Sequence, residues 1–244
     1  MSKDRTKSLL AASLCAAIVL ASGCASKGIP LTASAKKSTA KELDMQYSMA
    51  RAHEQEGKLA EAHQLYESIY QANPDSSEVC HRLGVVKVRI GKTTEGITYL
   101  MEADALSPND AKIKSDLGYA HILQGEFDIA EGFLRDSLNL NPTDMRSVNN
   151  LALSVGHQGR MEESFTIYRS VMSDAEAHAN IGFVYSEQGN AEMAMRHYDI
   201  ALDKDPSLKS AAEALVQMNE IQTQVIASQK KMNESGIQLT NGEM

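Results

Sequence analysis

The chain has few of the residues from which metal and catalytic sites are built. It contains no tryptophan and three cysteines, and its seven histidines are scattered along 244 residues. No His-x-x-x-His or Cys-x-x-Cys pattern occurs, so no metal site is predicted. Gly91-Lys92-Thr93 matches the end of a phosphate-binding loop, but Val86 occupies a position where that loop requires glycine. We therefore expect no enzyme activity, no cofactor and no metal ion.

Positive charge is also in short supply. Lys and Arg number 24 against 32 Asp and Glu, which gives a formal net charge of −8. A protein that binds nucleic acid needs a basic stripe along its surface. The composition therefore argues against a nucleic-acid partner, and it fits a soluble body that is held off an anionic membrane.

Residues 1–23 have the composition of a secretory signal peptide. Three basic residues lie among the first seven, and an apolar run follows over residues 9–20. This run is too short to span a membrane comfortably. It leads into the sequence Leu-Ala-Ser-Gly-Cys at residues 20–24, in which small residues stand directly before a cysteine.

This segment resembles the lipobox of bacterial lipoproteins. The resemblance implies that diacylglycerol alkylates the Cys24 thiol, that the chain is cut before Cys24 and that the new amine is acylated. Several acyl chains anchor firmly, whereas a single chain holds only marginally. Ala25 and Ser26 stand where an aspartate usually marks retention in the inner membrane, so we expect an outer-membrane anchor facing the periplasm. The alternative is an ordinary signal peptide whose cleavage site happens to precede a cysteine.

Residues 24–42 are small, polar and slightly basic, which predicts a flexible tether. Cys15 would leave with the signal peptide and Cys24 would be lipidated. Cys80 would then be the last thiol, so the mature chain could form no intramolecular disulfide. We expect Cys80 to be a buried structural thiol, since nothing near it in the sequence would lower its pKa.

Glycine recurs at a regular interval through the rest of the chain. Five glycines are separated by 34, 34, 34 and 30 residues, and each lies between two stretches with the apolar spacing of short amphipathic helices. A period of 34 residues predicts a helix–turn–helix repeat. The five are Gly57, Gly91, Gly125, Gly159 and Gly189.

A repeat frame that starts at Leu43 aligns the units. Small residues recur at positions 8 and 20, which lets the two helices of a pair approach closely. Larger residues at positions 7 (Met49 in the first unit) and 24 fill the space between helices. Proline at position 32 ends the second helix in four units, because it cannot continue a helix. The fourth unit lacks this proline and is four residues short, so we expect a shortened second helix or a tight turn there. The units are 43–76, 77–110, 111–144, 145–174 and 175–208.

These units resemble the tetratricopeptide repeat (TPR) family over residues 43–208. The resemblance implies an all-α fold, a right-handed superhelical solenoid of about five helix-turn-helix repeats plus a C-terminal capping helix. Such arrays hold other proteins on a concave surface and rarely carry chemistry of their own. The chain departs from the family at position 4, where the large aromatic residue that is often found there is missing.

In this family, positions 2, 5, 9, 12 and 13 of each first helix line the concave groove. Position 9 is apolar in four successive units here, and an apolar patch with a polar rim is typical of an interaction site. The resemblance implies a groove for an extended peptide or an amphipathic helix of a protein partner. Packing of these residues against neighbouring units is the alternative. The pattern of the chaperone-binding carboxylate clamp is missing, which disfavours capture of a C-terminal carboxylate. The expected groove residues are Tyr47, Arg51, His81, Val85, Val88, Arg89, Tyr119, Ile122, Leu123, Asn149, Leu153, His157 and Phe183.

The frame is lost after residue 208. Residues 209–232 predict one more helix with a polar side rich in glutamine, which suits the end cap that a repeat array needs. A helix contact with another molecule is the alternative. Residues 233–244 have few apolar residues and predict a disordered, frayed tail. The plausible apolar face of the helix is Ala212, Leu215, Met218, Ile221 and Val225.

The combination of a lipobox, a short tether, about five units and a truncated fourth unit resembles the TadD family of tight-adherence (Flp) pilus assembly lipoproteins. This resemblance implies a scaffold that assembles or localises a pilus secretin and its partners. Two other classes stay open. One is an adaptor lipoprotein that recruits peptidoglycan hydrolases or proteases, and the other is a glycosyltransferase-associated repeat protein, which would need a catalytic partner.

Overall fold

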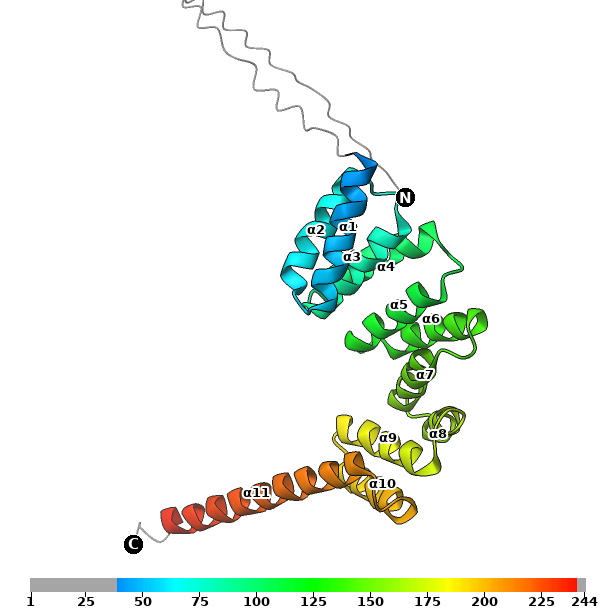
Figure 1. Cartoon of the computed structure of the whole chain (residues 1–244). Coiled ribbons are helices and arrows are strands. Elements are labelled where there is room, and N and C mark those ends of the chain that lie inside the picture. Colours follow the sequence, from blue (N-terminus) through cyan, green and yellow to red (C-terminus); the bar gives the residue numbers. More distant parts are fainter. Residues whose placement is uncertain (1–38, 241–244) are drawn as a thin grey trace, which may run out of the picture. The chain divides into compact units, whose positions relative to one another are not determined.

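A computed structural model describes residues 39–240. Within this range the backbone forms eleven α-helices and no strand (Figure 1). The predicted signal peptide, Cys24 and nearly all of the predicted tether lie outside the described residues. The helices are α1 (Ala40–Gln55), α2 (Leu59–Ala72), α3 (Ser77–Arg89), α4 (Thr93–Leu106), α5 (Ala111–Leu123), α6 (Phe127–Leu140), α7 (Met145–His157), α8 (Met161–Arg169), α9 (Asp174–Glu187), α10 (Ala191–Lys204) and α11 (Lys209–Thr240).

The first ten helices form five consecutive pairs, and each pair packs against the next (Figure 1). The chain reverses between the two helices of each pair at a glycine whose φ lies between +74° and +84°. Residues with a Cβ rarely adopt this left-handed backbone conformation, whereas glycine does so readily. All five predicted turn glycines are confirmed. Glycine is required at these positions by the backbone angle. A side chain would have room there, because a Cβ built on any of the five meets no atom within 4 Å.

Other glycines are required because a side chain would not fit, and the second pair shows this with Gly84 and Gly96. A Cβ on Gly84 of α3 would lie 2.8 Å from Cγ of Leu100 and 2.9 Å from the carbonyl oxygen of Gly96, both on α4. A Cβ on Gly96 would lie 2.8 Å from the carbonyl oxygen of Gly84. The small residues predicted at positions 8 and 20 thus bring the two backbones of this pair into close contact.

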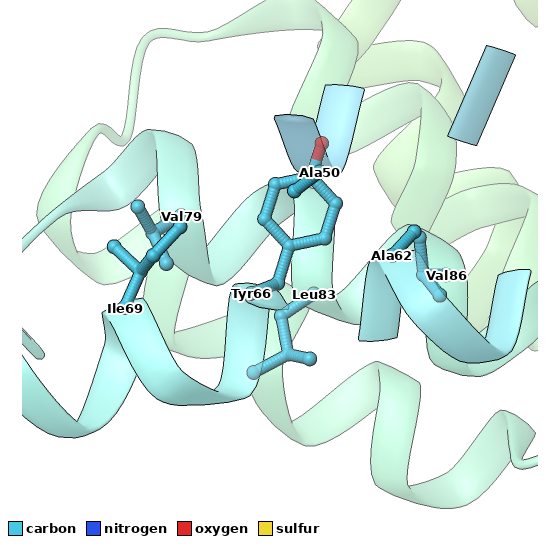
Figure 2. Packing of buried hydrophobic residues seen from close by; sticks show 7 residues of the cluster. All are labelled: Ala50, Ala62, Tyr66, Ile69, Val79, Leu83 and Val86. Atoms are coloured by element: carbon cyan, nitrogen blue, oxygen red, sulfur yellow. The ribbon is translucent and has the colours of Figure 1, made fainter. Parts of the chain in front are cut away.

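Burial of the larger residues follows the repeat frame. Val79 and Leu83, at positions 3 and 7 of α3, pack onto Tyr66 and Ile69 of the preceding helix α2 (Figure 2). Met49 occupies the same position 7 in α1, and its predicted role in filling the space between helices is wrong. Its side chain is 47% exposed, because no described pair precedes α1 to cover it.

The fourth pair is shorter than the others, as predicted. Helix α8 has nine residues, whereas every other second helix has 14. The next helix begins without a preceding proline. Instead, Ser173 accepts a hydrogen bond from the backbone N–H of Glu176, and the Glu176 carboxylate accepts one from the backbone N–H of Ser173. This capping box fixes the start of α9.

The first helix begins before the predicted boundary at Leu43. Helix α1 starts at Ala40, because Thr39 and Glu42 form a second capping box. The Thr39 N–H donates to the Glu42 carboxylate at 2.7 Å, and the Glu42 N–H donates to the Thr39 hydroxyl at 3.3 Å. The last residues of the predicted tether are therefore helical.

The last helix continues past its predicted end at residue 232. Helix α11 extends to Thr240, so the segment predicted as a frayed tail is helical over 233–240. No proline interrupts this segment, so nothing in the sequence forces the helix to end at residue 232. Only the first part of α11 packs on α10: Ala211 is buried, and Leu215 and Met218 are half-buried. None of the described helices is long and apolar enough to cross a membrane.

Candidate functional site

Three successive first helices, α3, α5 and α7, enclose a cavity of about 370 Å³ together with α4. We call it the α3–α7 cavity. One part of its wall is apolar and the other carries charged and amide side chains, a combination typical of ligand sites. The apolar lining is Val85, Val88, Leu100 and Tyr119, and the polar lining is Arg89, Asp116, Arg146, Asn149 and Asn150.

A buried carboxylate, Glu54, joins Arg89 of this cavity to two further arginines, Arg51 and Arg82, that lie outside its lining. Glu54 of α1 is 5% exposed and accepts hydrogen bonds from the Tyr66 hydroxyl at 3.0 Å and from Nε of Arg82 at 3.1 Å. Arg51 lies 3.0 Å and Arg89 3.4 Å from its oxygens. Burial, together with this carboxylate, raises the pKa of Tyr66 to about 12. One negative group therefore holds three guanidinium groups, and this cluster has an excess of positive charge.

A second carboxylate joins α3, α5 and α7. Asp116 accepts a hydrogen bond from Arg146 at 2.6 Å, and Nε2 of His81 lies 2.7 Å from its other oxygen. Burial alone would raise the pKa of Asp116. The hydrogen bond with His81 and the charges of His81 and Arg146 outweigh that effect, so the pKa of Asp116 is lowered. The wall of the α3–α7 cavity is therefore charged at neutral pH and tied across three repeats.

A more polar cavity of about 400 Å³ lies between α1, α3 and α5. We call it the α1–α5 cavity. The Tyr47 hydroxyl donates a hydrogen bond to Glu78 on its rim, and burial together with this bond raises the pKa of Tyr47. Its polar groups include several that already bond one another. The lining is Tyr47, Arg51, Ser77, Glu78, His81, Arg82, Ser107, Asp110, Lys112 and Ile113.

The structure brings eight of the thirteen predicted groove residues to these two cavities. Tyr119 presents a ring that is 42% exposed. Val88 lines the α3–α7 cavity and is also buried against Gly96 in the core of its pair. His81 lines the α1–α5 cavity, and its Nε2 lies 2.7 Å from Asp116. The α3–α7 cavity receives Val85, Val88, Arg89, Tyr119 and Asn149, and the α1–α5 cavity receives Tyr47, Arg51 and His81.

The other five predicted residues line neither cavity. Ile122 packs against the core between α6 and α7, and the His157 ring stacks on Phe127 with centroids 4.3 Å apart. Burial lowers the pKa of His157. For these two residues the alternative interpretation, packing, describes their surroundings better. Leu123 and Phe183 are 50% and 46% exposed, Leu153 is half-buried, and their role in binding stays a prediction.

Sequence reasoning missed several residues of the site. Position 6 of three successive first helices carries Arg82, Asp116 and Asn150, all polar, and this recurrence was visible in the repeat frame. Arg146 stands at position 2, which the family resemblance had already assigned to the groove. Leu100 lies on a second helix, and no sequence signal identified it.

Reactive groups elsewhere are few. Cys80 is a free buried thiol whose pKa is raised by burial, as expected for a structural cysteine. His178 and His197 face each other with Nδ1 atoms 3.2 Å apart, and burial lowers both pKa values. Among the residues with described side chains, no three His, Cys, Asp or Glu groups gather in a way that could hold a metal ion.

Two family models match the N-terminal part of this array. Residues 43–86 and 77–110 each match a model described as the tetratricopeptide repeat. The chain carries tetratricopeptide repeats. Together with the five packed helix pairs, this identifies the all-α body as a TPR superhelix with α11 as its C-terminal cap.

Solved structures agree on the fold. MamA is similar with a TM-score of 0.57 and 21% identity, over 69% of this chain and 94% of MamA. YrrB, described as a TPR protein with an unusual peptide-binding site, is similar with a TM-score of 0.55 and 19% identity, over 69% of this chain and 89% of YrrB. Identities this low show the shared fold alone.

Similarity to a curated protein is confined to part of that protein. The chain is 24% identical over 156 residues to BBSome complex member BBS4 of Bos taurus. The match covers 62% of this chain and 30% of BBS4, so the chain spans less than a third of that relative's length.

Proposed function

We propose that this chain is a non-enzymatic scaffold that holds a segment of a partner protein in the α3–α7 cavity. Repeat arrays of this kind present surfaces for other proteins. One observation carries the proposal: the cavity combines an exposed aromatic ring, Tyr119, with apolar side chains and the Asn149 amide in one wall. An apolar cavity with a few polar groups in its wall is typical of a binding site.

An extended segment fits the placement of these groups best. The cavity is lined from three successive first helices, so a strand-like segment that crosses them contacts side chains from three repeats. An apolar side chain of the segment would lie between Val85 and Tyr119, and the Asn149 amide would bond the segment's backbone. Arg89 and Arg146 line the same cavity and would favour a carboxylate nearby. The description of YrrB as a peptide-binding TPR protein supports this mode.

Photo-crosslinking tests the site. A photoreactive residue at Tyr119 should capture a partner in cells of the source organism, and one at Met101 on α4 serves as the control, since the two positions are 42% and 45% exposed. Adducts seen at Tyr119 and absent at Met101 support the proposal. Identical adducts from both positions, or none from either, overturn it.

We further propose that Cys24 carries the lipid anchor, at the periplasmic face of the outer membrane. The support is the N-terminal sequence, with its basic start, short apolar run and small residues before Cys24. An alkyne-labelled palmitate should label the wild-type chain and leave Cys24→Ser unlabelled, and the labelled protein should fractionate with outer membranes. Equal labelling of both chains would contradict the anchor.

For the cellular role we propose assembly or localisation of a pilus or secretion complex. The support is the combination of lipobox, tether and truncated fourth repeat. Deletion of the gene should abolish surface fibres and adherence. The second candidate is an adaptor for peptidoglycan hydrolases or proteases, and it predicts altered cell shape or hydrolase levels with the fibres intact.

A further inference from the structure

The distal part of α11 exposes a row of large apolar side chains. Ile221, Val225 and Met232 are 54%, 48% and 72% exposed. Two of them join Met195 and Met218 in a largely apolar groove of about 470 Å³ beside the turn between α9 and α10. This much exposed apolar surface on one helix face is typical of an interaction site.

The row has the spacing of a coiled-coil seam. Steps of three and four residues alternate along α11 without interruption from residue 211 to residue 232. The first members, Ala211 and Ala214, pack on α10. The row therefore continues an existing helix–helix contact past the point where α10 covers it. Its members are Ala211, Ala214, Met218, Ile221, Val225, Ser228 and Met232.

We propose that a second copy of this chain covers the row from Met218 to Ser228, with the two α11 helices side by side and antiparallel. The two-fold axis would pass between Ile221 and Val225. Such a contact uses the same surface on both copies and closes on itself, so it yields a dimer and no larger assembly. The inference does not depend on the proposed groove function.

The side-chain sizes fit this arrangement. In antiparallel order, Ile221 of one copy faces Val225 of the other, and Met218 faces Ser228, whereas Ala214 stays covered by α10 of its own copy. The large Met218 thus meets the small Ser228 on each side of the centre, which allows the two rows to interdigitate. A parallel pair would instead place Ser228 on Ser228 and leave a polar layer inside the seam.

The residues that flank the row favour a helix partner over a lipid surface. Glutamine occupies most flanking positions, so two copies meet without repulsion between like charges. A helix that lies on a membrane usually carries many Lys and Arg beside its apolar face. Over residues 209–233 the polar side of α11 carries only Lys209, Lys230 and Lys231 against Glu213 and Glu220.

Sedimentation equilibrium of the full chain in detergent tests the dimer. Between about 1 and about 100 µM, where small interfaces dissociate, the wild-type mass should rise towards twice 26.6 kDa. The double variant Ile221→Glu/Val225→Glu should stay monomeric. The control Thr223→Glu/Ala227→Glu adds the same charge at the same spacing on another face and should dimerise like wild type. A monomeric wild type, or equal loss in both variants, overturns the proposal.

Disulfide trapping tests the orientation. Two differently tagged chains, one with Met218→Cys and one with Ser228→Cys, should crosslink to each other on oxidation. Each alone should not crosslink to itself, because equivalent residues lie about 15 Å apart along the axis of an antiparallel pair. Self-crosslinking of Met218→Cys would show a parallel pair and overturn the orientation. A wild type that stays monomeric but sediments with anionic vesicles, while Ile221→Glu/Val225→Glu does not, would assign the row to a membrane instead.

Discussion

The two ends of the repeat array leave different faces of a first helix open. In α1, Met45 and Met49 at positions 3 and 7 are 61% and 47% exposed, whereas the small Ala50 at position 8 is fully buried. In α11 the pattern is reversed: Ala211 at position 3 is fully buried, and Val216 at position 8 is 59% exposed.

This difference shows what each repeat contributes to burial. Positions 3 and 7 are covered by the pair before, and position 8 is covered by the second helix of the same pair. Among the described residues, no preceding pair covers positions 3 and 7 of α1, and no second helix covers position 8 of α11. Helix α11 therefore begins like the first helix of a sixth pair, and no second helix of that pair follows among the described residues.

The strongest test compares one frame position in the middle and at the end of the array. Leu83→Glu should cost more than about 4 kcal/mol of unfolding free energy, because it buries an unpaired charge at a site with 0% exposure. Met49→Glu, at the same position in α1, should change the free energy by less than about 0.5 kcal/mol. Urea unfolding followed by circular dichroism measures both. If both variants lost the same unfolding free energy, the idea that the preceding pair buries position 7 would be wrong.

A second test concerns position 8. Gly84→Ala should destabilise by about 2 kcal/mol, because the new Cβ would meet Cγ of Leu100 and a backbone oxygen at under 3.0 Å. Val216→Ala, at the same position of α11, should have almost no effect. Gly132→Ala is the control, since a Cβ there meets nothing within 4 Å. It should stabilise the helix by about 0.5–1 kcal/mol through propensity alone.

The smallest expected effect is on pH dependence. Burial and the neighbouring positive charges lower the pKa values of His178 and His197 below 6.5, so the unfolded chain binds more protons than the folded one under mildly acidic conditions. Stability from this pair is present above pH 6.5 and falls as the pH drops towards the lowered values. In thermal melts, the Tm of the wild type should fall between pH 7 and pH 5. The Tm of His197→Gln should fall by a few degrees less. Residues 209–233 of α11 contain no histidine, so no such step arises there.

The fold was largely predictable because it repeats. Turn glycines, small residues and prolines each occur several times in the same frame, so a weak local preference becomes a strong pattern. The short α8 followed from the missing proline and four absent residues. The ends were harder: the capping of α1 by Thr39 depends on a single local interaction, and the continuation of α11 to Thr240 follows no position that recurs in the repeat.

The candidate site was less predictable than the fold. The family frame indicates which positions face the groove, and it located Tyr119, Asn149 and Arg89. It does not indicate which charged residues bond one another, so the roles of Glu54 and Asp116 emerged only with the geometry. His157 and Ile122 show the reverse case, in which a position assigned to the groove is taken up by packing against a neighbouring helix.

The length of α11 has a mechanical consequence. A helix of 32 residues is about 48 Å long, and α10 holds only its first part (Figure 1). It is therefore a lever whose base rests on the last pair. A tilt of about 10° at that base moves the far end by about 8 Å. A fluorophore near residue 233 would thus magnify any small rearrangement of the fifth pair into a displacement that distance measurements between labels can resolve.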